Sequence, residues 1–143
     1  MKGINLGRVI LGGLLAGVVN NIAGYVINEV ILRADHDAAF KALGKAMPEG
    51  GMTMVTWAVM GFVFGIAAVW LYAAIRPRYG AGVGTAVRAG VAVWFFSSVY
   101  MTIVMTNLGV FALNATSVCL ELVAGVIATV AGAWLYKEDG AAA

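Results

Sequence analysis

Residues 53–75 read TMVTWAVMGFVFGIAAVWLYAAI and contain no charged side chain. About 20 apolar residues in an α-helix span the ~30 Å hydrocarbon core of a bilayer, so this stretch predicts a membrane-spanning helix. Further apolar runs of similar length cover residues 7–32, 84–106 and 112–136. We therefore predict an all-α, polytopic membrane four-helix bundle that forms a single domain over residues 1–143.

The composition favours the same class. Hydrophobic residues make up 62% of the chain and charged residues only 11%, and the mean hydropathy is +0.93. A soluble domain carries about 25% charge, so this composition excludes a separate soluble catalytic module. The net charge of +2 gives no indication of nucleic-acid binding. Cys119 is the only cysteine, which excludes an internal disulfide and a cysteine-based metal cluster.

The segment between the first two runs has a different, amphipathic character. At helical spacing, its apolar residues fall on one face and its lysines on the other. We expect a short helix over residues 35–47 that lies on the membrane surface, is capped by Asp35 or Asp37 and stops at Pro48. After the second run, the sequence RPRYG at 76–80 predicts a turn that breaks the helix at its proline.

Lysine and arginine residues predict the orientation. The two ends of the chain and the middle loop carry Lys2, Arg8, Arg76, Arg78, Arg88 and Lys137, whereas the other two loops carry only Arg33, Lys41 and Lys45. The positive-inside rule therefore places both termini in the cytoplasm.

The two halves of the chain resemble each other. The second and fourth runs both end in Trp-Leu-Tyr, at Trp70 and Trp134, and the first and third both begin with an arginine and small residues. This pattern predicts a parallel repeat of two helices, related by an axis along the membrane normal. Chance similarity between apolar helices is the alternative.

Five polar residues fall at a similar depth in the predicted helices. Counting ~1.5 Å per residue from each helix end gives an intramembrane polar layer of Asn20, Asn21, Ser97, Ser98 and Glu121. An acid inside a membrane is costly and is a functional candidate by default. Glu121 is therefore a candidate for proton or cation transport, and the alternative is a neutral acid that joins helices through hydrogen bonds.

Small residues recur at helical spacing on three of the predicted helices. These helix-packing seams are Gly13, Gly17 and Gly24; Gly61 and Gly65; and Ala124, Ala128 and Gly132. Small residues at this spacing let helix backbones approach closely. Some seams must serve the chain itself, but four helices do not need this many. One seam is therefore a candidate for facing a partner chain or a flat hydrophobic cofactor.

The third run carries an aromatic stripe, Trp94, Phe95, Phe96 and Tyr100. Such a stripe usually faces lipid or belongs to the core, and beside a glycine groove it would also suit a lipid tail or a carotenoid. His36 is the only histidine, and no catalytic set, metal site or phosphate-binding loop can be assembled from the polar residues. The sequence therefore predicts no enzyme.

Residues 7–17 (GRVILGGLLAG) and 70–78 (WLYAAIRPR) resemble a group of small four-helix proteins of the bacterial inner membrane. The resemblance implies that location and brings no activity with it. We expect an accessory or structural subunit of a homo-oligomer or of a larger bioenergetic complex, respiratory or photosynthetic, with lipid or carotenoid as a ligand. The alternative is a small oligomeric channel or proton-coupled transporter that uses Glu121.

Overall fold

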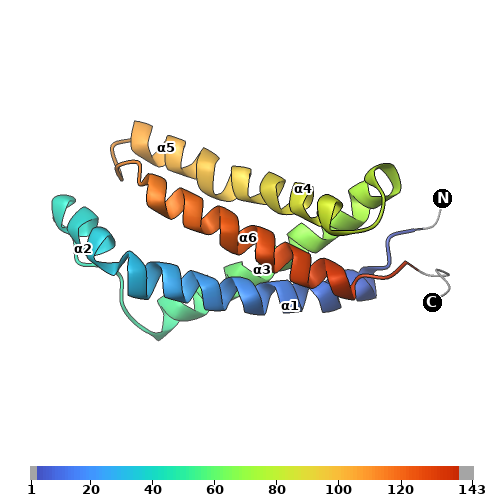
Figure 1. The fold of residues 1–143 in the computed structure, drawn as a ribbon. Helices are drawn as coiled ribbons and strands as arrows, with labels where there is room; N and C mark the ends of the chain where they lie inside the picture. Colours follow the sequence, from blue (N-terminus) through green and yellow to red (C-terminus); the bar gives the residue numbers. More distant parts are fainter. Residues whose placement is uncertain (1–2, 139–143) are drawn as a thin grey trace.

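The computed structural model describes residues 3–138, and all regular secondary structure in this range is helical. Four long helices lie side by side (Figure 1). The first is α1 (Leu6–Tyr25), which continues through a π-helical segment, η1 (Val26–Ile31), and the second is α3 (Gly51–Tyr79). The third consists of α4 (Val83–Trp94), the π-helical segment η2 (Phe95–Tyr100) and α5 (Met101–Asn107). The fourth is α6 (Ala115–Leu135), and a short helix, α2 (Arg33–Ala42), follows the first.

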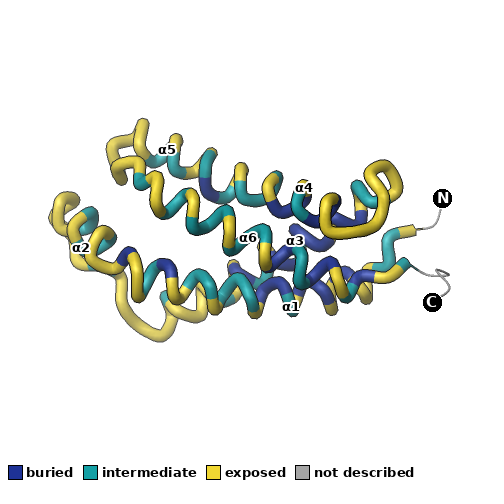
Figure 2. The backbone as a smooth tube through the Cα atoms, viewed as in Figure 1, coloured by how far each residue is buried: buried dark blue, intermediate teal, exposed yellow. Residues whose placement is uncertain are grey.

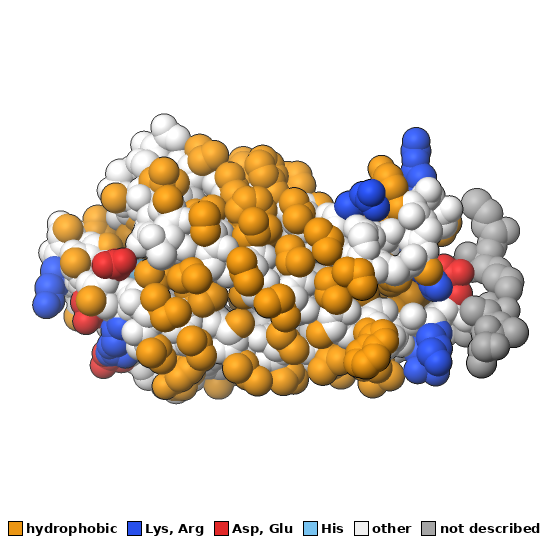
Figure 3. All heavy atoms as spheres, viewed as in Figure 1, with side chains coloured by type: hydrophobic (Ala, Val, Ile, Leu, Met, Phe, Trp, Pro, Cys, Tyr) orange, Lys and Arg blue, Asp and Glu red, His pale blue; other side chains and the backbone are white. Residues whose placement is uncertain are grey.

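All four long helices are long and apolar enough to cross a membrane, as the sequence predicts. They contain 26, 29, 25 and 21 residues, and their most apolar windows have mean hydropathies between 1.6 and 2.2. At ~1.5 Å per residue even the shortest, α6, extends roughly 32 Å, which matches a ~30 Å hydrocarbon core. Charged side chains gather toward the two ends of the molecule, and the face between them is mostly hydrophobic (Figure 3).

Asparagine caps fix where α1 and α6 begin. The Asn5 side chain accepts a hydrogen bond from the backbone N–H of Arg8 at 3.0 Å, and Asn114 accepts one from Ser117 at 3.1 Å. Each cap satisfies a backbone donor that the helix itself leaves without a partner. The fourth helix therefore begins at Ala115, slightly later than the predicted start at residue 112.

The turn predicted at Pro77 is wrong, because α3 continues through this proline to Tyr79. Proline cannot donate to the carbonyl four residues earlier, but in the last turn of a helix this loss is small. The helix ends at Gly80, which has a φ of +85° and donates its N–H to the carbonyl of Arg76 at 2.9 Å. Glycine adopts this left-handed conformation at little cost, so the glycine ends the helix and the proline does not.

The surface helix begins and ends earlier than predicted. α2 starts at Arg33 without a side-chain cap, and it ends at Ala42. Gly44, with a φ of +69°, reverses the chain, and the N–H of Lys45 donates to the carbonyl of Phe40 at 3.0 Å. This glycine cap ends the helix before Pro48 is reached. The predicted aspartate cap and proline stop are therefore both wrong.

The four long helices form a ring in which α1 and α4 lie on opposite sides. Both of them lie against α3 and against α6, and they do not touch each other. The first turn of α1, the last turn of α6 and the α3–α4 turn lie at the same end (Figure 1). We call the half of the structure at this end the closed half. The open half is the other one, which contains α2, η1, the first turns of α3, and α5.

Most of the buried residues belong to the closed half (Figure 2). Its core consists largely of small side chains, with two tyrosines at the end: Val9, Ala16, Val69, Tyr72, Ala73, Ala86, Ala89, Ala133 and Tyr136. The tyrosine rings meet edge to face, with centroids 5.9 Å apart. Their hydroxyl oxygens accept hydrogen bonds from backbone N–H groups, Tyr72 from Gly82 at 3.3 Å and Tyr136 from Asn5 at 3.4 Å. These contacts tie the chain segments together at this end.

The first and third helices both contain a six-residue π-helical segment on the side of the open half. A π turn accommodates an extra residue, so it changes which side chains the following turns direct inward. The two segments occupy similar places in the two halves of the chain, and the predicted repeat itself stays a prediction.

Candidate functional site

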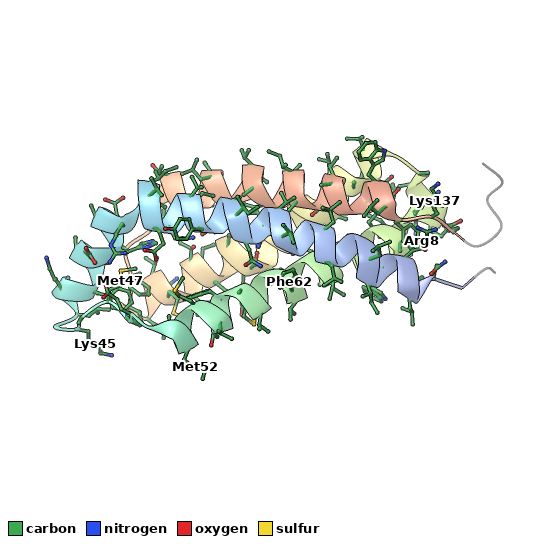
Figure 4. All side chains as sticks on the ribbon, turned by 90° about the horizontal axis from the view of Figure 1, so that it is seen from below. Arg8, Lys45, Met47, Met52, Phe62 and Lys137 are labelled. Carbon is green, nitrogen blue, oxygen red and sulfur yellow. The ribbon has the colours of Figure 1, made fainter. Side chains whose placement is uncertain are left out.

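The glycine seams of the first two helices face each other in the closed half. A Cβ atom on Gly65 would lie 2.5 Å from the backbone of both Gly13 and Gly17, and one on Gly13 would lie 2.5 Å from the Cα of Ile66. A Cβ on Gly17 would collide with Phe62, which lies midway along the molecule (Figure 4). At these positions the two backbones approach so closely that a larger side chain would separate the helices.

The small residues of α6 face α1. A Cβ on Gly132 would lie 2.5 Å from the carbonyl oxygen of Gly12 and 2.8 Å from the Cβ of Ala16. One turn earlier, Ala128 is buried, and Ala124 is half-buried. Most of the predicted seam positions therefore make contacts within the chain. Of the seam glycines, only Gly24 has no neighbouring atom within 4 Å of its Cβ position.

In the open half, the inward faces of the helices are further apart. On α6, Gly125 lies two turns before Gly132, and on α1, Gly24 lies two turns after Gly17. Each therefore lies on the same, inward-facing side of its helix as the glycine two turns away. No atom of a neighbouring element lies within 4 Å of the Cβ position of either Gly24 or Gly125. The helix faces that touch in the closed half are therefore separated by open space here.

The opening arises because the first turns of α3 leave the other helices. The backbone of η1 approaches α2 and α6 but not α3, and the backbone of α5 approaches only η2. Met54, two turns before Gly61 and therefore on the inward face of α3, is 65% exposed. Met52, at the start of α3, lies at the edge of the molecule (Figure 4). Within the described residues, no helix covers this part of α3.

The two adjacent asparagines of the predicted polar layer differ in their surroundings. The Asn21 side chain donates to the carbonyl of Ala58 at 3.1 Å, and it fills the space over Gly61, where a Cβ would collide with it. Asn21 thus joins α1 to α3. The side chain of Asn20 is half-buried and has no hydrogen bond to any described residue. One residue turns a helix by ~100°, so the neighbours of the two side chains are different.

Glu121 and the two serines lie on the other two helices. The Glu121 carboxylate accepts a hydrogen bond from the Ser117 hydroxyl, one turn earlier in α6, at 3.3 Å. The Ser97 hydroxyl donates to the carbonyl of Trp94 at 3.4 Å, and Ser98 is only 8% exposed. Between residues 3 and 138, no hydrogen bond joins any two of the five polar-layer residues. Asn21, Ser97 and Glu121 therefore have separate local partners, and the five residues form no shared network.

Glu121 nevertheless has a distinctive position. It lies three turns before Gly132, on the inward face of α6, and one turn from the open space at Gly125. The carboxylate is half-buried. The arrangement is an acid in the open half, one turn further from the closed half than Gly125, with a serine hydroxyl as its hydrogen-bond donor.

The aromatic stripe is divided between two environments. The Trp94 indole N–H donates to the carbonyl of Val118 at 2.9 Å and so connects the third helix to α6, directly before η2. Phe95, Phe96 and Tyr100 are exposed, and the two phenylalanine rings meet edge to face with centroids 5.5 Å apart.

Two open apolar grooves flank the third helix. A groove of about 460 Å³ runs between α3 and the third helix, and Phe64, Ser97 and Met101 are among its lining residues. A second groove, of about 480 Å³, follows one face of α4 and η2 from Arg88 to Phe96. The exposed surface that lines both grooves is almost wholly apolar.

Ion pairs and hydrogen bonds hold the end of the open half. Arg33 pairs with the carboxylates of Glu29 at 2.5 Å and Glu49 at 2.7 Å, and the nearby Glu29 charge raises the pKa of the Arg33 guanidinium above its already high ordinary value. The Asn114 side chain donates to Asp35 at 3.1 Å, so α2 is connected to the loop before α6.

The sequence-based site misses the methionines. Apart from Met1, every methionine lies in one of two short segments, and these residues are Met47, Met52, Met54, Met60, Met101 and Met105. The structure places both segments in the open half (Figure 4 labels Met47 and Met52). Methionine is flexible and polarizable, which suits adaptable binding surfaces. The clustering was visible in the sequence, but only the fold assigns the two segments to the same half.

No group of three or more histidine, cysteine, aspartate or glutamate side chains that could hold a metal ion occurs among residues 3–138. Comparison of the chain with protein-family models, with curated proteins and with solved structures found no match. The resemblance seen in the sequence therefore stays a prediction, and a function must be inferred from the arrangement of the helices.

Proposed function

We propose that the chain is a multi-pass protein of a bacterial inner membrane, in which the four long helices form a membrane-spanning bundle. The distribution of charge supports an orientation. At the end of the closed half, the described residues include five bases, Arg8, Arg76, Arg78, Arg88 and Lys137, and one acid, Glu138. At the end of the open half they include three bases, Arg33, Lys41 and Lys45, and four acids, Glu29, Asp35, Asp37 and Glu49. By the positive-inside rule, the closed end, with both termini, faces the cytoplasm. Lys2, which the sequence-based count includes, lies outside the described residues.

In this membrane the protein would act as a non-enzymatic accessory or structural subunit. The observation that carries the proposal is the uncovered inward face of α3 at Met54. An opening with apolar walls inside a membrane is filled by lipid chains or by another helix, since water gains no hydrogen bonds there. A helix of a second copy, or of a larger bioenergetic complex, would complete the side that α3 leaves open. The neighbouring 460 Å³ groove would hold a lipid or carotenoid chain.

A photoreactive residue at position 54 tests this proposal. Val59 provides a matched control, because it lies in the same part of α3, faces the opposite way and is 53% exposed. We expect illumination of intact membranes to join benzoylphenylalanine at position 54 to a protein, either a second copy or another subunit identified by its mass. At position 59 we expect adducts with lipid. Lipid adducts alone at both positions, or protein adducts only at position 59, would refute the assembly role.

A second function, a small oligomeric channel or proton-coupled transporter, is favoured by the position of Glu121 beside the open space at Gly125. Such an acid can take up and release a proton when the opening admits water. The closed half weighs against this function, because its core consists mainly of glycine, alanine and valine, and its buried polar side chains include no charged group.

Proton flux in reconstituted vesicles distinguishes the second function from the first. Transport through the acid predicts that Glu121→Gln abolishes the flux, whereas Ser117→Ala, which keeps the carboxylate, retains most of it. If the native protein gives no flux above that of empty vesicles, or if Glu121→Gln leaves the flux unchanged, the transport function is excluded.

A further inference from the structure

We propose that the groove along α4 and η2 binds an anionic phospholipid, with Arg88 holding the headgroup and the apolar floor holding an acyl chain. The inference rests on the proposed membrane location and does not depend on assembly with a partner. The groove has a volume of about 480 Å³ and is lined by Val87, Arg88, Val91, Ala92, Phe95 and Phe96. Arg88 is the only charged residue among them.

Arg88 has no carboxylate partner among the described residues. At the closed end the nearby acid, Glu138, lies 3.4 Å from Arg76 and is therefore engaged. The Arg88 guanidinium lies over the ring of Tyr79, with its central carbon 5.2 Å from the ring centroid. Because the ring contact uses no hydrogen-bond acceptor and the guanidinium makes no hydrogen bond to a described residue, its N–H groups are able to bind an anion. The side chain is thus positioned as a phosphate ligand that has no ion-pair partner among residues 3–138.

The groove extends from this cation toward the middle of the proposed membrane. Arg88 lies in the second turn of α4, close to the level of the lipid headgroups. From Val87 to Phe96 the helix rises roughly 14 Å at ~1.5 Å per residue, and all side chains on the floor beyond Arg88 are apolar. At the far end, η2 places Phe95 and Phe96 edge to face. The groove therefore has a cation near the membrane surface and apolar side chains deeper in the membrane. A phospholipid has the matching arrangement, with its phosphate at the surface and its acyl chains below.

The positive charge of Arg88 determines which lipid headgroups the groove prefers. An anionic headgroup such as phosphatidylglycerol brings a net negative charge to Arg88, whereas phosphatidylcholine also brings its own cation. Basic sites between or beside membrane helices on the cytoplasmic side recognise anionic headgroups in this way. Free phosphate would contact Arg88 alone and gain nothing from the apolar floor, so the site favours the lipid.

Native mass spectrometry provides the test. The full chain is reconstituted in vesicles of equal amounts of phosphatidylglycerol and phosphatidylcholine, extracted gently and weighed with its retained lipid. We expect the native protein to retain phosphatidylglycerol over phosphatidylcholine by about fivefold, the factor that ~1 kcal/mol from one arginine gives. Arg88→Gln should bring the two lipids to equal retention. Arg8→Gln, an exposed arginine at the same end but outside the groove, should preserve the preference.

A second variant keeps the test decisive if Arg88→Gln folds poorly. Val91→Trp fills the groove and retains the arginine, and we expect it to lower phosphatidylglycerol retention. Equal retention of both lipids by the native protein, or an unchanged preference in both groove variants, would overturn this site alone. A native protein that carries no lipid of either class would also count against the membrane location.

Discussion

The closed and open halves are built from the same long helices, yet they differ in how those helices meet. In the closed half, glycine and alanine occupy the contacts, and the backbones of Gly12 and Gly132 are nearly in contact. In the open half, glycines on the same faces, Gly24 and Gly125, have no neighbour within 4 Å. A glycine therefore brings helices together only where another helix packs against the face that carries it.

The change between the halves coincides with the end of the small-residue contacts. On α3 the inward face passes from Gly65 through Gly61 to Met54, and on α1 the contact with α3 ends at Asn21. The π-helical segments begin soon afterwards in the first helix and at the corresponding level in the third. The structure thus has one end where helix backbones are in close contact and one end where larger apolar side chains such as Met54 are left uncovered.

The strongest test of this difference is to place the same large side chain in each half. Gly65→Leu would push its Cβ to 2.5 Å from the Gly13 and Gly17 backbones, so we expect a loss of about 3 kcal/mol or more in unfolding free energy. Gly125→Leu meets open space, and leucine favours a helix over glycine by about 0.8 kcal/mol, so we expect no loss. Unfolding of both variants in one detergent measures the difference. Equal losses would show that the two halves are packed alike.

The adjacent asparagines give a smaller contrast. Asn21→Ala removes the hydrogen bond to the Ala58 carbonyl between α1 and α3, which should cost about 1 kcal/mol, within the range for such bonds between membrane helices. Asn20→Ala removes no hydrogen bond and should change the unfolding free energy by less than about 0.5 kcal/mol. The same unfolding measurement serves for both. A larger loss for Asn20→Ala would mean that this side chain has a structural role that its contacts do not explain.

The four long helices could be predicted because apolar runs of this length, with few charged residues, are expected to form membrane-spanning helices. The second run was predicted at 53–75 and the helix covers Gly51–Tyr79. The errors at the ends have local causes. Pro77 lies in the last turn, where its missing donor matters little, and Gly44 and Gly80 act as caps because of backbone conformations that composition does not reveal.

For the candidate site, the sequence predicts the depth of each residue but not the direction of its side chain. Counting residues along a helix gives the level of Asn20, Asn21 and Glu121, whereas the neighbours of each side chain depend on rotation about the helix axis. Rotation in turn depends on how the helices meet, and the π-helical segments, such as VINEVI in the first helix, have no distinctive sequence. The same limit explains why small-residue seams could be recognised on each helix while their partners on other helices could not be assigned.

Trp94 offers the mildest test of the comparison, because it lies where the third helix passes from the closed half to the open half. Trp94→Phe keeps a large aromatic ring and loses the indole N–H that donates to Val118 at 2.9 Å. That carbonyl belongs to the interior of α6, where it can keep its helical hydrogen bond, so we expect a loss of only about 0.6 kcal/mol. Trp57→Phe is the control, since Trp57 is 72% exposed and makes no hydrogen bond to a described residue.

Hydrogen exchange gives a sharper measurement of the Trp94→Phe variant. Loss of the hydrogen bond from Trp94 to Val118 should speed amide exchange in η2 and α5 while leaving the closed half unchanged. Faster exchange throughout α4 and α6 would instead mean that the two halves unfold as one unit.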